Sequence, residues 1–347
     1  MQEHLQNIVK PLLQWFETNK RDLPWRKDRH PYHIWISEIM LQQTRIEAVK
    51  KYYVNFMKEL PDTESLSLVA EDKLLKLWEG LGYYSRAKNL KKAAELIMQE
   101  YGGKFPDSYE QLLKLPGVGE YTAGAIASIC FNEKVTAIDG NVLRVISRVL
   151  GSRKNVLLPK TKKEIDQKLQ KILPEQSGMF NEALMELGEM VCLPGAAPEC
   201  TRCPVQSDCI AHRDNLTAEI PVRIKKLKRK REEKTILVLM TENNRIAIEK
   251  RTEKGLLSGM YQLPNLNGFY SEEELKSILR EWQLTSMKIS FLKNAKHVFT
   301  HIDWHMKGYL VTVEQQCSQF LWVSPQELSE KYPLPTAFQT FIKNLSK

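Results

Sequence analysis

Four cysteines lie close together in the chain, and their side chains could share one metal centre. Cys192, Cys200, Cys203 and Cys209 fall within 18 residues, with the spacing C-x7-C-x2-C-x5-C. Zinc sites usually pair two C-x2-C knuckles across a long spacer, and only one such knuckle is present here. A [4Fe–4S] cluster needs four thiolates and tolerates a compact loop. The spacing favours one [4Fe–4S] cluster, with zinc as the alternative.

Two carboxylates, Glu38 and Asp139, have sequence neighbours that would separate their pKa values. If residues 31–42 form a helix, the positions three and four residues from Glu38 are mostly apolar, so burial would raise its pKa. Asp139 precedes an amphipathic segment, where it would cap the helix and stay ionised. A proton donor beside a carboxylate is the pair that glycosidic cleavage uses. Taken singly, Glu38 is better explained as a glutamate at the edge of an amphipathic helix, and Asp139 as a plain helix cap.

A glycine-rich turn, LPGVG at residues 115–119, joins two helical segments. Its glycines permit a tight turn, and the free N–H groups that begin the next helix suit a phosphate oxygen. Gly117, Val118 and Gly119 are therefore candidate contacts to DNA phosphate. This helix–turn–helix arrangement resembles the helix-hairpin-helix motif of DNA-repair proteins, although a glycine pair alone usually marks a simple turn.

The elements that must position these groups are helical over the first two-thirds of the chain. Apolar residues recur at helical spacing in 2–19, 46–60, 71–80, 86–101, 122–130, 141–150 and 162–173. In the run 223–234, eight of twelve residues are Lys or Arg, and strand-like patterns begin at Thr235. We expect an all-α domain at 1–222 that includes the cysteine loop 192–209. A basic linker at 223–234 and an α+β domain at 235–347 would follow.

Composition limits the possible partners. The 347 residues carry 51 Lys and Arg against 42 Asp and Glu, a net charge of +9, and 42% are hydrophobic. This composition excludes a disordered chain or a fibre, and the positive charge indicates an anionic partner, with nucleic acid first. The sequence shows no signal peptide or apolar run long enough for a membrane span. We expect a cytoplasmic monomer with no membrane partner.

Together these motifs resemble the endonuclease III superfamily of DNA glycosylases. The ordered signature of that superfamily is LPGVG, then an Asp 20 residues past the last glycine, then four cysteines. The usual first cysteine gap is six residues, and here residues 193–199 make seven. The resemblance covers residues 5–215 and implies an all-α helix-hairpin-helix glycosylase domain with an iron–sulfur loop. Five stretches resemble MutY-type adenine DNA glycosylases: RDLPWR (21–26), SEIMLQQT (37–44), WEGLGYYSRA (78–87), DGNVLRVISR (139–148) and FNEALMELG (180–188).

That resemblance implies a bacterial, nucleoid-associated enzyme that excises adenine mispaired with 8-oxoguanine or guanine in duplex DNA. The adenine would be flipped out of the duplex. By resemblance, Glu38 protonates adenine N7 and later activates water, Asp139 stabilises the oxocarbenium sugar, and Tyr121 and Asn141 hold that arrangement. Bifunctional relatives carry a lysine at the position of Tyr121. A phenol cannot form an imine, so we expect hydrolysis without strand cleavage.

The substrate contacts also follow from the resemblance. Residues that would line the adenine pocket are Leu23, Trp25, Arg26, Ile46 and Glu182. Gln43 and Tyr83 would wedge into the base stack beside 8-oxoguanine. The apolar members of the pocket set could equally belong to the core, because apolar lining is common to both.

Residues 235–347 resemble the Nudix-like domain of this family, through GLLSGMYQLP (255–264) and the order of strands. Residues 279–284 keep an Arg-Glu pair but lack the following Glu-Glu pair that binds Mg²⁺, so we expect no nucleotide pyrophosphatase activity. By resemblance, the loop Phe299-Thr300-His301 recognises 8-oxoguanine, with Thr300 where relatives usually have Ser. An ordinary turn between strands is the alternative.

Three other functions compete with adenine excision. A bifunctional pyrimidine-damage glycosylase/lyase is disfavoured by Tyr121 and by the additional C-terminal domain. A non-enzymatic DNA-binding protein would need only the hairpin, the cluster and the charge. A Nudix hydrolase with a helical appendage is disfavoured by the missing glutamates.

Overall fold

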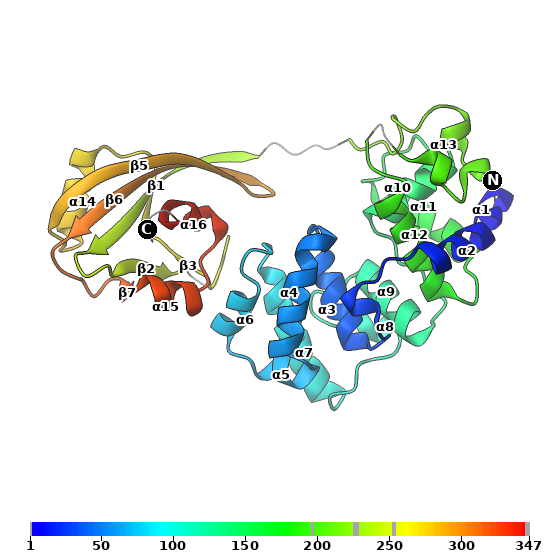
Figure 1. The fold of residues 1–347 in the computed structure, drawn as a ribbon, viewed down its shortest axis with the longest axis horizontal. Coiled ribbons are helices and arrows are strands. Elements are labelled where there is room, and N and C mark those ends of the chain that lie inside the picture. Colours follow the sequence, from blue (N-terminus) through cyan, green and yellow to red (C-terminus); the bar gives the residue numbers. More distant parts are fainter. Residues whose placement is uncertain (1, 196–197, 225–228, 252–254, 344–347) are drawn as a thin grey trace. The chain divides into compact units, whose positions relative to one another are not determined.

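The structure, a computed structural model, describes residues 2–195, 198–224, 229–251 and 255–343 (Figure 1). Contacts divide the chain into two compact units. Unit 1 comprises Met1–Leu68 and Asn89–Lys225, and unit 2 comprises Val69–Lys88 and Lys226–Lys347. Within the described residues, no helix combines the length and apolar composition that crossing a lipid bilayer requires.

The described residues of unit 1 form helices joined by loops, without a β-strand. Its helices begin where the sequence offers caps: the Ser108 hydroxyl accepts from the Gln111 amide, and Pro31 and Pro159 each occupy a first helical position. The α-helices are α1 (Gln2–Asn7), α2 (Val9–Asn19), α3 (Pro31–Leu41), α4 (Ile46–Glu59), α5 (Thr63–Leu68), α7 (Ser85–Glu100, which begins in unit 2), α8 (Tyr109–Leu112), α9 (Glu120–Phe131), α10 (Gly140–Val149), α11 (Pro159–Gln170), α12 (Ser177–Met190) and α13 (Ile210–Arg213). Short 3-10 helices are η1 (Pro24–Arg26), η2 (Cys200–Arg202) and η3 (Gln206–Asp208).

The helices that carry the candidate groups are deeply buried. α3 is buried from Ile34 to Met40, and α9 from Thr122 to Ile129. α10 is buried from Val142 to Val149, and it packs in one core cluster with side chains of α2, α11 and α12. Any ionisable group on these helices that points inward is therefore removed from water, which shifts its pKa.

Unit 2 contains a mixed sheet. Among its described residues, strands follow the order β3-β2-β1-β6-β5, with β4 pairing with β1 and β7 with β2. β1 and β6 run parallel, and the other neighbouring pairs are antiparallel. The strands are β1 (Lys230–Thr241), β2 (Ile246–Lys250), β3 (Tyr261–Gln262), β4 (Asn265–Asn267), β5 (Ser286–Val298), β6 (Ile302–Val313) and β7 (Leu321–Val323). The helices are α6 (Glu71–Leu77), α14 (Glu272–Glu281), α15 (Pro325–Glu330) and α16 (Thr336–Ile342).

Alternating residues of β1 contribute to two separate cores, as the two-residue period of a strand requires. Ile236 and Val238 belong to the cluster that includes side chains of α16. Leu237 and Leu239 belong to the cluster that includes Leu275 and its neighbours on α14. The sheet is thus covered on both faces, and the α+β fold expected for this region is confirmed.

The boundaries differ from the expected ones in two places. β1 begins at Lys230, inside the run expected to be a linker, of which residues 225–228 lie outside the described part of the chain. Trp304 Nε1 donates to Glu232 Oε2 at 3.1 Å, and Lys234 Nζ lies 4.9 Å from the Trp304 ring centroid. These contacts stabilise the charged residues Glu232 and Lys234 on strand β1. A count of charges along the sequence does not reveal such contacts.

The second difference is the segment Val69–Lys88, which groups with unit 2 although it lies within the helical part of the sequence. Asp72 accepts from Lys250 Nζ at 2.7 Å and from the Tyr261 hydroxyl at 3.2 Å. Glu79 accepts from the Leu334 amide at 2.8 Å. These polar contacts join the segment to residues far along the chain, and no local sequence feature marks the grouping.

Candidate active site

Glu38 lies on the buried helix α3, with 7% of its surface exposed. Its helical neighbours Ile34 and Trp35 are also buried. Burial disfavours the charged carboxylate and is the main reason that the pKa of Glu38 is raised to about 7. A hydrogen bond from the Tyr121 hydroxyl to Glu38 Oε2 opposes this rise. A substantial fraction of Glu38 is therefore protonated near neutral pH.

Tyr121, near the start of α9, connects Glu38 to a neighbouring helix. Its hydroxyl donates to Glu38 and also lies 3.2 Å from Met185 Sδ on α12. Burial, followed by the charges of Glu38 and Asp139, raises the pKa of Tyr121 well above its ordinary value. Tyr121 therefore stays a neutral donor.

Asp139 caps α10, as its sequence position predicts. Its Oδ1 accepts from the Val142 amide at 2.7 Å, and its Oδ2 accepts from Asn141 Nδ2 at 2.8 Å. These bonds favour the ionised form, but burial outweighs them and raises the pKa of Asp139 above its ordinary value. The capping bonds therefore do not set this pKa by themselves, because desolvation is the larger cause. The charge of Asp139 is itself one cause of the raised pKa of Glu38. Both oxygens of Asp139 accept from N–H donors, which favours its ionised form, whereas Glu38 accepts from a neutral phenol.

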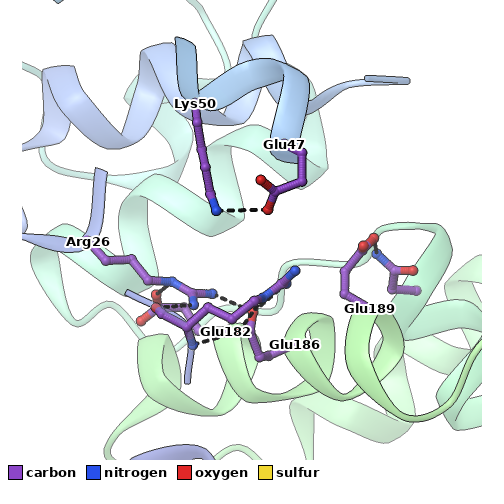
Figure 2. Close-up of polar contacts among 8 residues, drawn as sticks. Arg26, Glu47, Lys50, Glu182, Glu186 and Glu189 are labelled. Carbon is purple, nitrogen blue, oxygen red and sulfur yellow. Dashed lines mark hydrogen bonds and ion pairs between the residues drawn. The ribbon is translucent and has the colours of Figure 1, made fainter. Parts of the chain in front are cut away.

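Three of the predicted adenine-pocket residues lie around η1. Leu23 and Trp25 are 1% and 4% exposed, and the Trp25 ring meets the Tyr53 ring edge-on at 5.4 Å. Arg26 Nε lies 3.3 Å from Glu182 Oε1 (Figure 2). Burial raises the pKa of Glu182, while Arg26 opposes the rise. Ile46, the first residue of α4, is partly exposed.

The sequence did not reveal Glu186, which lies one turn beyond Glu182 on α12 (Figure 2). Arg21 donates to Glu186 from its amide, Nε and Nη2 at 2.9, 2.8 and 2.9 Å, and Arg26 Nη2 adds a bond of 2.9 Å. Burial alone would raise the pKa of Glu186, but these hydrogen bonds outweigh it and lower the pKa to about 2. The two arginines of RDLPWR thus form a network that anchors this segment to α12. The sequence feature that could have indicated Glu186 is its i,i+4 spacing from Glu182, which places the two carboxylates on one face of a helix.

Two predicted wedge residues have unusual backbones. Gln43, in unit 1, has φ 60°, and Tyr83, in unit 2, has φ 49°. Both side chains are exposed. Residues other than glycine rarely adopt this left-handed conformation, and such outliers gather at functional sites.

The hairpin turn has the expected form between α8 and α9. Gly117 has φ +78°, and a Cβ there would lie 2.6 Å from Asn89 Cβ, so the fold itself requires glycine. Gly119 caps α9 with an ordinary φ of −100°, and a Cβ there would meet no atom within 4 Å. The Val118 amide donates to the Leu115 carbonyl at 3.1 Å, which leaves it less suited to a phosphate than predicted.

All four predicted metal-binding cysteines line one pocket, together with Arg148 and His212. Among the described residues, which omit 196 and 197 of this loop, no three His, Cys, Asp or Glu side chains converge as they would on a single ion. Burial raises the pKa of Cys203 to about 12 and also raises the pKa values of Cys200 and Cys209. These sulfurs would ionise only beside a compensating positive charge, which a metal centre supplies.

Two arginines of α10 hold this loop. Arg148 is 2% exposed, and its Nη1 lies 3.3 Å from Cys192 Sγ. Arg144 Nε donates to the Cys192 carbonyl at 2.7 Å. Arg148 further donates to the carbonyls of Leu193, Gly195, Thr217 and Ile220, at 2.8–3.0 Å.

The predicted recognition loop, residues 299–301, is the turn between β5 and β6 in unit 2. The Phe299 ring packs edge-on against Trp304 at 4.8 Å, while Thr300 and His301 are exposed. The Tyr83 hydroxyl lies 3.3 Å from Thr300 Oγ1, also within unit 2. The structure thus brings together two side chains that the sequence predicted to contact the same base.

Comparison with known proteins matches both parts of the chain. The profile described as "HhH-GPD superfamily base excision DNA repair protein" matches residues 36–175, and a NUDIX domain profile matches residues 235–344. An adenine DNA glycosylase of Buchnera aphidicola (subsp. Schizaphis graminum) is 36% identical over 87% of this chain and 86% of its own length. The adenine DNA glycosylase of Mus musculus is 33% identical over 88% of this chain and 70% of its own.

Solved structures match the helical fold. A thermostable thymine-DNA glycosylase aligns with a TM-score of 0.55 and 29% identity, over 61% of this chain and 98% of its own. A trapped endonuclease III–DNA covalent intermediate aligns with a TM-score of 0.53 and 23% identity, over 62% of this chain and 99% of its own, which supports the fold alone.

The matching profile and relatives, together with the helical fold and the hairpin, define a DNA glycosylase of the HhH-GPD superfamily, a base-excision-repair enzyme that hydrolyses N-glycosidic bonds. The chain belongs to the adenine DNA glycosylase family. The family and the fold class expected from the motifs are therefore confirmed.

The Glu186 network generates a stability prediction. Glu186→Gln should lower the free energy of unfolding at pH 7 by about 3 kcal/mol, because the partly buried Arg21 loses its carboxylate partner and Arg26 retains Glu182 but loses its second carboxylate. Since folding lowers this pKa, the stabilisation is present above the ordinary value of 4.5 and is lost as the pH falls towards about 2. Urea unfolding at pH 7 and at lower pH checks this. Glu175→Gln, at a 91% exposed carboxylate paired with Lys134, is the control and should leave the midpoint of urea unfolding unchanged.

Proposed function

We propose that this protein excises adenine mispaired with 8-oxoguanine or guanine from duplex DNA and leaves an abasic site without cutting the strand. The observation that carries the proposal is the group formed by the buried Glu38 and the partly buried Tyr121 and Asp139. It offers a proton donor and a carboxylate, with a phenol where an imine-forming amine would stand. The similarity to adenine DNA glycosylases supports adenine as the excised base.

In the proposed mechanism, the adenine leaves the base stack and Glu38 transfers its proton to adenine N7. The electrons of the bond between C1′ and N9 then move into the purine, which leaves as neutral adenine, and the sugar becomes an oxocarbenium ion. The Asp139 carboxylate stabilises this cation. Ionised Glu38 accepts a proton from water as the water oxygen bonds to C1′, which restores the acid.

Neighbouring residues support these two roles. Tyr121 donates to Glu38, and Asn141 donates to Asp139, so each carboxylate is oriented by one neutral side chain. Leu23, Trp25 and Ile46 would contact the purine ring, and Glu182 would accept from its exocyclic amine. Arg26 keeps that carboxylate in place through its 3.3 Å contact.

Recognition of 8-oxoguanine is assigned to Thr300 and His301, with Gln43 and Tyr83 entering the base stack. Exposure of the loop and the contact between Tyr83 and Thr300 support this assignment. The threonine hydroxyl keeps the hydrogen-bonding group that serine offers to a base. Gly119 and the first amides of α9 would bind a backbone phosphate.

We also propose that Cys192, Cys200, Cys203 and Cys209 hold one [4Fe–4S] cluster. Four sulfurs spread around one pocket suit a cube of iron and sulfide better than a single ion. Arg148, beside Cys192 Sγ, offers positive charge to the negatively charged cluster. The cluster would maintain the shape of the loop.

Excision is tested with a duplex containing adenine opposite 8-oxoguanine, incubated with the protein and analysed with and without alkali. We expect nicking at the adenine position only after alkali, because hydrolysis leaves an intact abasic strand. Nicking without alkali, together with borohydride trapping of the protein on DNA, would instead indicate a lyase.

The two carboxylates are tested by conservative substitution. Glu38→Gln and Asp139→Asn should each slow single-turnover excision by about 100-fold or more, because one loses the proton donor and the other the charge facing the cation. The rate of the unsubstituted protein should fall as the pH rises through about 7, where Glu38 loses its proton. Retained binding of the mispaired duplex is the control, and near-normal excision by either variant contradicts the mechanism.

The recognition loop is tested by the double substitution Thr300→Ala with His301→Ala. We expect a reduced preference for adenine opposite 8-oxoguanine over adenine opposite guanine, with excision of the latter little changed. Both side chains are exposed, so folding should persist. The ratio of the two excision rates is the measurement, and an unchanged ratio would return the loop to an ordinary turn.

The metal centre is tested by purification without added metal. We expect visible absorption of an iron–sulfur protein and about four irons per chain. Cys203→Ser should lose this absorption, whereas Cys317→Ser, at a cysteine of unit 2 outside the four-cysteine loop, should keep it. One tightly bound zinc per chain would overturn the assignment.

A further inference from the structure

Glu189 is an exposed carboxylate that the proposed mechanism does not use. It lies on the last turn of α12, on the helix that also carries Glu182 and Glu186 (Figure 2). Its Oε1 accepts a hydrogen bond of 3.0 Å from Asn141 Nδ2. The same Nδ2 donates to Asp139 Oδ2 at 2.8 Å. One amide nitrogen therefore bridges Glu189 and the carboxylate that faces the sugar in the proposed reaction.

The orientation of the Asn141 amide is determined by its charged partners. Its Oδ1 accepts from Arg144 Nη2 at 2.8 Å, while its two N–H groups point to Asp139 and Glu189. Rotating the amide by half a turn would place its oxygen against two carboxylates and its N–H groups against a guanidinium. Glu189 therefore stabilises the orientation in which Asn141 donates to Asp139.

The backbone allows this contact through Gly188. A Cβ at Gly188 would lie 2.5 Å from Asn141 Cβ, so only glycine lets α12 approach α10 this closely. Glu189 follows directly and can reach the amide. The negative charge of Glu189 also acts on the candidate active site, because it is one cause of the raised pKa of Tyr121.

An exposed carboxylate in this position is unfavourable for the binding of DNA. Nucleic acid brings a dense row of phosphates, and like charges at the binding surface weaken association. Glu186 on the same helix is matched by Arg21 and Arg26, whereas the hydrogen bond of Glu189 goes to a neutral amide. A benefit at the chemical step would compensate for this cost in binding.

We propose that Glu189 is a positioning residue that acts through Asn141. By accepting from Nδ2, it keeps an N–H directed at Asp139 and so holds that carboxylate where positive charge develops on the sugar. This inference rests on the proposed excision of adenine. It predicts that loss of Glu189 slows chemistry without weakening the binding of DNA, a combination that general damage to the fold does not produce.

The test compares Glu189→Ala, Glu189→Gln and the control Glu175→Ala, which removes an exposed carboxylate paired with Lys134. Single-turnover excision of adenine opposite 8-oxoguanine gives the chemical rate. Affinity is measured with the same duplex carrying 2′-fluoro-2′-deoxyadenosine, whose electron-withdrawing fluorine disfavours the oxocarbenium ion. Glu189→Ala should be slower by about tenfold, the equivalent of one hydrogen bond, and should bind equally well or more tightly. Glu189→Gln should stay within about threefold of the unsubstituted protein, because its amide oxygen accepts the same bond.

The possible outcomes separate the two proposals. If the unsubstituted protein does not excise adenine, the proposed function fails. If it does and Glu189→Ala is equally fast, the role of Glu189 fails. Weakened binding and a lower melting temperature in Glu189→Ala would indicate a structural role, and a Glu189→Gln as slow as Glu189→Ala would exclude hydrogen-bond acceptance as the cause. Glu175→Ala should match the unsubstituted protein in rate and affinity.

Discussion

The buried guanidinium of Arg148 links helix α10 to the cysteine loop in unit 1. Arg148 is removed from water, so its N–H donors must find acceptors inside the protein. It finds them in carbonyl groups of the cysteine loop and of the chain that follows, including those of Leu193 and Ile220. The helix that carries Arg148 begins with the cap Asp139, so one rigid helix determines the positions of both the loop and the carboxylate.

The site also shows how partners, and not residue type, determine a pKa. Glu38 and Glu186 are both buried glutamates, with 7% and 1% of their surfaces exposed. Glu38 accepts from a neutral phenol and has a pKa of about 7, while Glu186 pairs with two arginines and has a pKa of about 2. The first is suited to donate a proton at neutral pH. The second stays ionised and holds the RDLPWR segment against α12.

In unit 2 a rigid sheet presents a small exposed turn. Phe299 is held against Trp304, whose indole N–H is bonded to Glu232 on the neighbouring strand. Thr300 and His301 project from this anchored position, an arrangement in which a loop can read a partner while the sheet supplies the rigidity. The sheet is covered on both faces, so the fold remains intact although no Mg²⁺-binding Glu-Glu pair follows Arg280-Glu281 at the end of α14.

The amino-acid sequence by itself determined the helical and α+β regions, the hairpin, the cap at Asp139 and the shared position of the four cysteines, because periodicity, glycine and capping act over a few residues. Only the tertiary structure decided which distant groups meet. Arg21 and Glu186 are 165 residues apart, and Asn141 and Glu189 are 48 apart. Burial decided that the pKa of Asp139 rises despite its cap, and pairing with β6 decided that β1 begins within the basic run. Desolvation and charge pairing depend on all the elements that surround a side chain, and those elements come together only in the folded chain.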